Sequence, residues 1–264
     1  MNIPRAKGRP AESPLAESLK VPVWKRVLDV SCILLVLPVS LMAMMAVAIL
    51  IKLVSNGPVF FKQERVGYLG RRFLCYKFRS MAVTSDQKVH RKHMEHLIGS
   101  DLPMTKMDVK GDLRLIPFGW FLRATGLDEL PQLINVLRGE MSLVGPRPCV
   151  PFEYERYLPW QKERFNTLPG LTGLWQVSGK NHTTFVEMMD LDINYCRNKS
   201  LWLDFEILLK TLPAVIGQTR ETASHKKPEL GWVATSNRLS RAERSGFRHG
   251  EVALAVVVET DSRT

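Results

Sequence analysis

The chain has 264 residues, a length that suits one domain of ordinary size with appended segments. Its net charge of +11 and isoelectric point of about 9.7 favour an anionic partner, such as acidic lipid, nucleotide phosphates or nucleic acid. The cysteines are scattered, without a Cys-x-x-Cys pair: Cys32, Cys75, Cys149 and Cys196. This spacing excludes the usual disulfide framework and zinc site, and it indicates reduced thiols on the cytoplasmic side.

The N-terminal region predicts a tail followed by a membrane segment. Residues 1–21 hold three prolines, several charges and few large apolar side chains, so we expect a disordered basic tail. Residues 30–51 then carry no charged side chain over 22 positions. That length is enough for a straight helix to cross about 30 Å of hydrocarbon. The membrane-inserted unit is therefore placed at residues 22–57.

Two features indicate that this segment dips into the membrane and returns. Cations flank both of its ends: Lys25 and Arg26 precede it, and Lys52, Lys62 and Arg65 follow it. The positive-inside rule would place such cations on only one side of a spanning helix. Pro38 lies near the middle and should break the helix, with the Ser40 hydroxyl available to a freed carbonyl. A spanning helix with a proline kink is the alternative.

The next elements are strands. Residues 59–66 and 72–78 are rich in β-branched and aromatic side chains and are separated by a turn at Gly67 and Gly70. An apolar-faced helix at residues 202–216 should either pack inside or lie in the membrane plane. Together these patterns predict an α+β fold, mostly helical around a small sheet.

The stretch from residue 122 to residue 148 contains the groups suited to chemistry. It places two adjacent carboxylates, Asp128 and Glu129, between two arginines, Arg123 and Arg147. Carboxylates can attack phosphorus or hold Mg²⁺, and guanidinium groups neutralise phosphoryl oxygens. The set therefore suits chemistry on a phosphate diester or a diphosphate.

Local patterns give the acids and Arg147 their expected positions. Apolar residues at helical spacing predict a short amphipathic helix that Gly139 closes: Leu130, Leu133, Ile134 and Leu137. Pro131 fits the first turn, where its missing N–H costs nothing. Acids at a helix N-terminus are favoured even without chemistry, so a capping role is the alternative. The prolines on either side of Arg147 restrict its backbone and should aim its guanidinium, unless it is an ordinary solvated loop arginine.

With these residues the chain resembles the bacterial sugar transferase family, the small monotopic phosphoglycosyl transferases that start exopolysaccharide and O-antigen synthesis. The resemblance covers roughly residues 22–218. It runs through five blocks in the family's order: 57–67 (GPVFFKQERVG), 76–81 (YKFRSM), 128–148, 169–179 (PGLTGLWQVSG) and 200–204 (SLWLD).

The resemblance implies a two-step exchange. A UDP-sugar binds with Mg²⁺, Asp128 attacks the phosphorus that bears the sugar, and UMP leaves. Undecaprenyl phosphate then attacks the resulting acyl phosphate and becomes a polyprenyl-diphosphate-sugar. Glu129 is implied as the Mg²⁺ ligand or proton-handling partner, with Asp128 beside it at the metal. The implied phosphate-binding residues are Arg123, Arg147, Lys77 and Lys180.

The family also implies a location and a domain plan. A catalytic domain at residues 58–220 would lie on the cytoplasmic face of the bacterial inner membrane, in contact with membrane lipids and held by the re-entrant helix. Residues 221–264 have no counterpart in the family and receive no function.

Two departures from the family pattern affect binding rather than the acid pair. Lys180 replaces an arginine and keeps the charge without the bidentate fork, and Leu168 replaces a cation. An inactive membrane scaffold of the same fold is the alternative function. Nucleic acid is not expected as a partner, because the high isoelectric point is unsupported by a stacking or helix-turn-helix motif. No motif distinguishes galactose from glucose.

Overall fold

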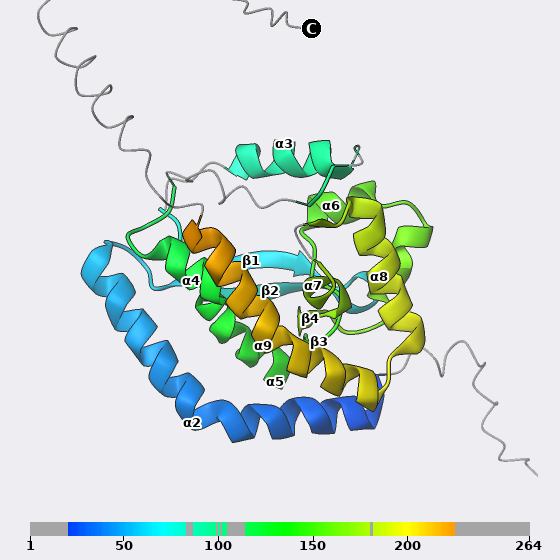
Figure 1. Ribbon diagram of the computed structural model, residues 1–264, viewed down its shortest axis with the longest axis horizontal. Helices are drawn as coiled ribbons and strands as arrows, with labels where there is room; N and C mark the ends of the chain where they lie inside the picture. Colours follow the sequence, from blue (N-terminus) through cyan, green and yellow to red (C-terminus); the bar gives the residue numbers. More distant parts are fainter. Residues whose placement is uncertain are drawn as a thin grey trace, which may run out of the picture. The chain divides into compact units, whose positions relative to one another are not determined.

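The computed structural model describes residues 21–82, 87–98, 100, 102–104, 114–179 and 182–224 (Figure 1). The predicted tail at residues 1–21 and the extension at 221–264 therefore fall almost wholly outside the described residues. The described part is mostly helical, as predicted. Its elements in chain order are α2 (Val23–Val54), β1 (Phe60–Val66), η1 (Tyr68–Gly70), β2 (Arg72–Phe78), α3 (Gln87–Ile98), α4 (Gly119–Thr125), η3 (Leu127–Gln132), α5 (Leu133–Leu137), β3 (Ser142–Val144), α6 (Pro151–Arg156), η4 (Trp160–Phe165), β4 (Gly170–Thr172), α7 (Leu174–Val177), α8 (Phe185–Asn198) and α9 (Leu201–Ser224).

Helix α2 is long and apolar enough to insert into a membrane. It runs through Pro38 without interruption, but its ribbon changes direction about midway (Figure 1). Proline removes one helical hydrogen bond and crowds the preceding turn, which bends a helix. The Ser40 hydroxyl donates to the Leu37 carbonyl at 3.0 Å. The expected break is thus a bend within one continuous helix.

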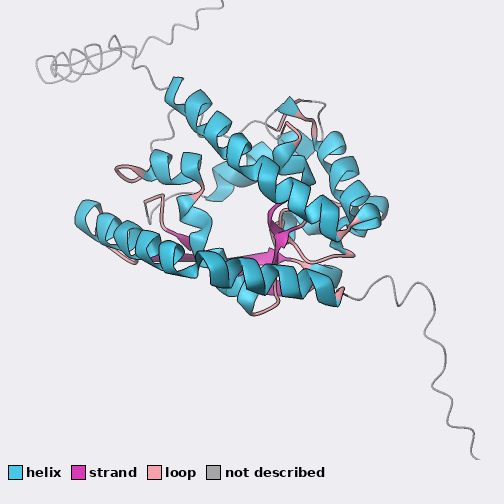
Figure 2. Ribbon diagram, turned by 60° about the horizontal axis from the view of Figure 1, so that its bottom comes forward, coloured by secondary structure: helices cyan, strands magenta, loops and turns pink. Residues whose placement is uncertain are grey.

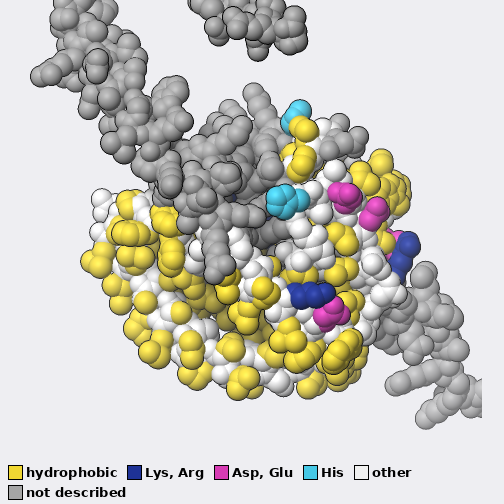
Figure 3. Space-filling view, in the orientation of Figure 1, with side chains coloured by type: hydrophobic (Ala, Val, Ile, Leu, Met, Phe, Trp, Pro, Cys, Tyr) yellow, Lys and Arg dark blue, Asp and Glu magenta, His cyan; other side chains and the backbone are white. Residues whose placement is uncertain are grey.

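The outer surface of α2 is apolar. Figure 3 shows hydrophobic side chains over the rim of the molecule that α2 forms. Leu35 is 81% exposed and Leu53 79% exposed, and they are two of a series of large apolar side chains that the protein leaves uncovered. A contiguous apolar surface of this kind marks a contact with lipid or another protein.

The first turns of α2 are fastened to the body of the protein by polar side chains. Lys25 is fully buried, and its Nζ lies 2.6 Å from Asp204 Oδ2 and 2.7 Å from the Tyr195 hydroxyl. Arg26 donates to two carbonyls at the end of α5. Asp29 accepts from the Ser142 hydroxyl and the Leu143 N–H. Lys25, one of the cations predicted to flank the membrane segment, is thus paired with Asp204 inside the protein and is not exposed on the surface.

The strands form two separate two-stranded sheets in the described residues, rather than the single small sheet expected. β1 and β2 pair antiparallel from Phe60↔Phe78 to Val66↔Arg72, which confirms the predicted strand pair and its turn. β3 and β4 pair in parallel. Just after β3, the chain passes very close to the segment that precedes β4. A Cβ on Gly145 would lie 2.3 Å from the Leu168 carbonyl oxygen, so glycine is required there.

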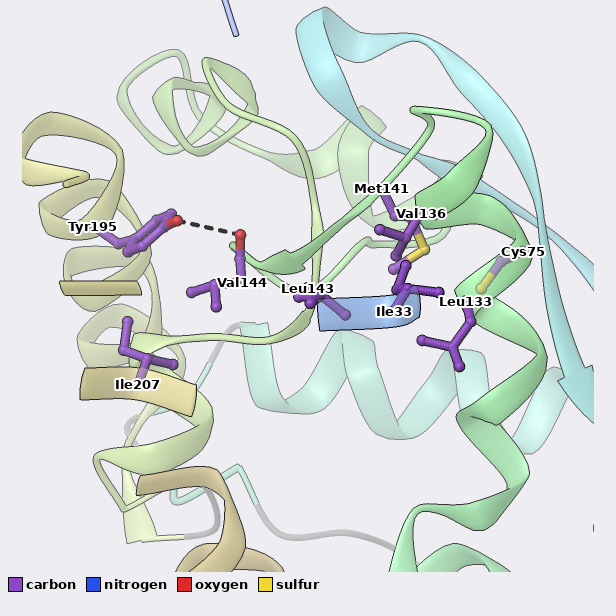
Figure 4. Packing of buried hydrophobic residues seen from close by; sticks show 9 residues of the cluster. All are labelled: Ile33, Cys75, Leu133, Val136, Met141, Leu143, Val144, Tyr195 and Ile207. Carbon is purple, nitrogen blue, oxygen red and sulfur yellow. Dashed lines mark hydrogen bonds between the residues drawn. The ribbon is translucent and has the colours of Figure 1, made fainter. Parts of the chain in front are cut away.

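The main hydrophobic core joins α2 to the elements that follow it. Figure 4 shows Ile33 of α2 beside side chains from the sheets and the later helices, all of them buried: Cys75, Leu133, Val136, Met141, Leu143, Val144, Tyr195 and Ile207. The Tyr195 hydroxyl oxygen also lies 3.2 Å from the Val144 carbonyl oxygen. The start of the membrane segment is therefore part of the folded core.

Helix α9 confirms the helix predicted at residues 202–216 and extends beyond it. Figure 2 shows α2 and α9 as the two long helices, and β3 contacts both of them. One face of α9 packs on α4 and α7. Its outer face is apolar, with Trp202 74% exposed and Leu212 69% exposed.

Candidate functional site

The two acids lie in η3, a 3₁₀ turn that leads directly into the short helix α5. Gly126, with φ of +73°, starts the turn, and its carbonyl accepts the Glu129 N–H at 2.9 Å. Gly139, with φ of +77°, follows the end of α5. The predicted helix with the acids at its N-terminal side is therefore present, although its first part is 3₁₀ rather than α.

The apolar stripe predicted for this helix is only partly correct. Leu133 is buried and Leu130 half-buried, but Ile134 is 38% exposed and Leu137 45% exposed. The buried side of α5 is formed instead by Leu133, Val136 and Asn135, and Asn135 is fully buried.

Asn135 is a site-building residue that the sequence analysis missed. Its side-chain oxygen accepts the Tyr76 N–H at 3.1 Å, and its side-chain nitrogen donates to the Leu74 carbonyl at 2.7 Å. This amide acts as a strand partner for β2 and so holds the strand that carries Lys77 against η3. The only signal in the sequence was a polar residue between two apolar ones, Ile134 and Val136.

Glu129 collects two of the predicted cations. Lys77 Nζ from β2 lies 2.6 Å from Glu129 Oε1, and both terminal nitrogens of Arg147 lie 3.3 Å from the same oxygen. The negative charge of Glu129 raises the pKa of Arg147. These three side chains come from separate parts of the chain and are all partly accessible, with exposed fractions of 15%, 21% and 34% for Lys77, Glu129 and Arg147. A negatively charged group that entered here would contact both cations.

The remaining predicted residues are placed as follows. Asp128 is buried beside Glu129, with 6% of its surface exposed. Arg123 lies half-buried in the last turn of α4, the helix that precedes η3. Lys180 lies outside the described residues. The structure therefore brings Lys77 and Arg147 together on one acid.

Arg65, one of the cations predicted to flank the membrane segment, contacts the turn that carries Arg147. Its Nη1 donates to the Pro148 carbonyl at 3.0 Å. Burial, and after it the charge of Arg147, lowers the pKa of Arg65. Two like charges thus lie near the same turn, and the negative charge of Glu153 opposes their effect by raising the pKa of Arg65.

The residues present are compatible with a magnesium ion. Mg²⁺ is usually held by one or two carboxylates together with substrate phosphates and water. Asp128 and Glu129 can supply that share. No cluster of three or more metal-ligating side chains occurs in the part of the chain that the structure describes, which argues against a fully protein-built cage there.

Comparison with known proteins agrees with the resemblance. The family described as bacterial sugar transferase matches residues 20–218. The UDP-galactose-lipid carrier transferase of Erwinia amylovora is 45% identical over 179 residues, covering 65% of this chain and 36% of the relative. The undecaprenyl-phosphate galactose phosphotransferase of Salmonella typhimurium is 39% identical over 199 residues, covering 73% of this chain and 40% of the relative.

A shorter relative matches over most of its own length. The exopolysaccharide production protein ExoY of Sinorhizobium fredii is 38% identical over 193 residues, which cover 73% of this chain and 85% of that protein. The chain spans well under half the length of the Erwinia and Salmonella relatives. The family match covers the acid pair, both cations that contact Glu129 and the membrane helix, and this chain belongs to the bacterial sugar transferase family.

Proposed function

We propose that this protein transfers a sugar 1-phosphate from a UDP-sugar to undecaprenyl phosphate, with Asp128 as nucleophile and UMP as the leaving group. The single observation that carries this proposal is the acid pair at η3, in which Glu129 forms ion pairs with Lys77 and Arg147 from two other parts of the chain. The names of the relatives support the class of donor and acceptor.

The chemistry follows from the charges at the site. A diphosphate that entered beside Glu129 would meet the planar guanidinium of Arg147, which matches two phosphoryl oxygens, and the point charge of Lys77. A carboxylate oxygen of Asp128 forms a bond to the phosphorus that bears the sugar. The bond from that phosphorus to the bridging oxygen breaks, and UMP leaves with the electron pair.

The second step regenerates the enzyme. A phosphate oxygen of undecaprenyl phosphate attacks the phosphorus of the aspartyl phosphosugar, and the carboxylate of Asp128 leaves. An acyl phosphate is reactive enough that even a weak nucleophile such as the lipid phosphate can displace the carboxylate from its phosphorus. Asp128 and Glu129 would hold Mg²⁺, which when bound neutralises charge on the phosphoryl oxygens.

We further infer that the enzyme works at the cytoplasmic face of the bacterial inner membrane and that α2 enters and leaves through that face. Its apolar surface and the bend at Pro38 support this placement. A re-entrant helix keeps the acid pair on the side where both a nucleotide sugar and a lipid phosphate can reach it.

The nucleophile is tested by Asp128→Asn, which keeps the size of the side chain but cannot form an acyl phosphate by direct attack. Membranes carrying the wild-type protein, given labelled UDP-galactose or UDP-glucose with Mg²⁺ and undecaprenyl phosphate, should release UMP and label lipid. The variant should lose both signals by at least about a thousandfold, as expected for a lost covalent nucleophile.

Controls separate loss of chemistry from loss of protein. The Asp128→Asn protein should reach the membrane in the same amount and melt at a similar temperature. Without the acceptor lipid, mass spectrometry of the wild type should find a sugar phosphate on residue 128. Normal turnover by the Asn variant would refute the assignment of the nucleophile, and an inactive wild type across a full donor panel would favour the scaffold.

A further inference from the structure

The backbone around Arg147 is held through its carbonyl oxygens. Four consecutive carbonyls each accept a hydrogen bond from another part of the chain: Pro146 from the Gly170 N–H at 2.9 Å, Arg147 from Arg164 Nη2 at 2.8 Å, Pro148 from Arg65 Nη1 at 3.0 Å and Cys149 from the Val66 N–H at 2.8 Å. The turn that presents Arg147 is therefore fixed at every residue.

The reason for this arrangement is the pair of prolines. Pro146 and Pro148 have no N–H, so two of these four residues can be held by the backbone only through their carbonyl oxygens. Backbone N–H groups of β1 and β4 hold its two ends. The carbonyls of Arg147 and Pro148, in the middle, are held by the long side chains of Arg164 and Arg65.

The Arg164 side chain that makes this contact is buried in the protein interior. It lies in η4 and forms an ion pair of 2.6 Å with Asp192 of α8, and both side chains are only 2% exposed. Its Nη1 donates to the Tyr157 hydroxyl at 3.2 Å. Buried this deeply, Arg164 cannot reach a substrate.

A buried ion pair is weak evidence for stability, because well-packed apolar side chains of the same volume stabilise a fold as well or better. What apolar side chains cannot supply is a donor to the Arg147 carbonyl. The guanidinium of Arg164 supplies it while Asp192 balances its charge. The contact that distinguishes Arg164 from an apolar replacement is thus its hydrogen bond to the turn.

We propose that Arg164, fixed by Asp192, and Arg65 are positioning residues that act through Arg147. They hold the turn so that the Arg147 guanidinium stays on Glu129, where an incoming diphosphate meets it. This inference rests on the proposed role of Arg147 in binding the phosphates of the donor. It assigns Arg164 and Arg65 no contact with substrate.

Arg164→Lys in the full-length protein tests the proposal. The lysine keeps a positive charge near Asp192 but lacks the planar guanidinium, whose Nη2 contacts both Asp192 and the Arg147 carbonyl while its Nη1 is held by the Tyr157 hydroxyl. We expect kcat/KM for the UDP-sugar to fall roughly 10- to 100-fold, since a small misplacement of a phosphate-binding group has an effect of this size.

A double-mutant cycle with Arg147→Met separates positioning from general damage. If Arg164 acts through Arg147, then Arg164→Lys should cause little further loss once Arg147 has been removed. A merely structural role predicts the same fold loss in both backgrounds, and that result would overturn the proposal.

Arg79→Lys is the matched control. Arg79 is also a buried arginine, 5% exposed, and it donates to the Asn56 carbonyl at 2.6 Å and the Ser55 carbonyl at 2.9 Å. Those carbonyls follow the end of α2 and are not part of the Arg147 turn. The control should lower the melting temperature about as much as Arg164→Lys does, while its kcat/KM changes by less than about twofold.

A structural measurement keeps this inference separate from the proposed function. In an experimental structure of the Arg164→Lys variant, the Arg147 guanidinium should lie more than about 4 Å from Glu129, beyond ion-pair distance. An unchanged contact would refute the positioning role even if the wild type released no UMP with any donor. A wild type without activity would refute the proposed function alone, because the position of Arg147 would still report on Arg164.

Discussion

Asp128 and Glu129 are neighbours in sequence but lie in different surroundings. The Glu129 carboxylate is shared between Lys77 and Arg147, whereas Asp128 is the more deeply buried of the two acids. Glu129 is therefore the acid on which the two cations gather, and Asp128, the proposed nucleophile, is the acid with less exposed surface.

The metal role proposed for Glu129 predicts a shift in magnesium dependence. Glu129→Gln keeps the shape of the side chain but removes the charge that attracts Mg²⁺. We expect the Mg²⁺ concentration for half-maximal UMP release to rise at least roughly tenfold, an effect typical of weakened metal sites. The measurement is a Mg²⁺ titration of UMP release, with EDTA abolishing release by the wild type.

The control for this titration is Lys77→Met, which removes a cation from the same carboxylate. It should raise KM for the UDP-sugar without raising the Mg²⁺ requirement, because the ligand itself is kept. An identical half-saturating Mg²⁺ concentration in the wild type and in Glu129→Gln would show that Glu129 is not a ligand.

At the scale of elements, α2 is long and apolar enough to enter a membrane and is also a structural part of the folded body. The ion pair between Lys25 and Asp204 joins its first turn to α9, with both side chains at most 1% exposed. The hydroxyl of Tyr195 from α8 donates to the second oxygen of Asp204 at 2.6 Å. The network thus links α2, α8 and α9 at one point.

Removing one partner of this pair should destabilise the protein strongly. Lys25→Met leaves the Asp204 carboxylate buried without its cation, and we expect a loss of about 3–5 kcal/mol in the free energy of unfolding. The double variant Lys25→Met with Asp204→Leu should recover part of that loss, because no uncompensated charge remains. Denaturation in a mild detergent, followed by tryptophan fluorescence, measures both.

An exposed pair on α9 provides the control for that experiment. Glu206 and Lys210 are 43% and 57% exposed and pair at one-turn spacing. Glu206→Gln should change stability by no more than about 0.5 kcal/mol. If Lys25→Met were equally mild, the buried network would not be what fastens α2.

The elements that the sequence predicted well are those with a local pattern. β1, β2 and α9 each contain enough residues for alternation or helical spacing to be visible, and the helix after the acids ends at Gly139 as expected. β3 and β4 have three residues each, too few for any periodicity, so their parallel pairing could not be foreseen.

The site was predicted as far as its motifs reach. The motifs predict Lys77 and Arg147 as phosphate-binding residues, and the structure places both on Glu129. The buried ion pairs of Arg164 and Lys25 cannot be predicted from the sequence, because their partners Asp192 and Asp204 lie far along the chain and only the fold brings them together. Ile134 is exposed for the same reason: tertiary packing, rather than its spacing, decides which side of α5 is covered.

At the scale of the whole described body, both ends of α2 are bound to the same folded unit. Near its start, Asp29 accepts hydrogen bonds from Ser142 and Leu143. Just past its other end, Arg79, which follows β2, donates to the carbonyls of Ser55 and Asn56. A helix tied at both ends to one unit cannot place those ends on opposite sides of a bilayer while that unit stays on one side.

This geometry predicts the topology of the protein in a cell. Tags placed at the N-terminus and at the C-terminus should both be reached by reagents only after the inner membrane is opened, because the proposed re-entrant helix keeps both ends of α2 with a body on the cytoplasmic side. The measurement is labelling of each tag in intact spheroplasts and in lysed ones, with a known periplasmic tag as the positive control. Pro38→Leu should straighten α2. A straighter helix is less able to turn back to the face it entered from, so a fraction of the N-terminal tags should become exposed outside. An N-terminal tag fully accessible in intact spheroplasts of the wild type would replace the re-entrant helix with a spanning one.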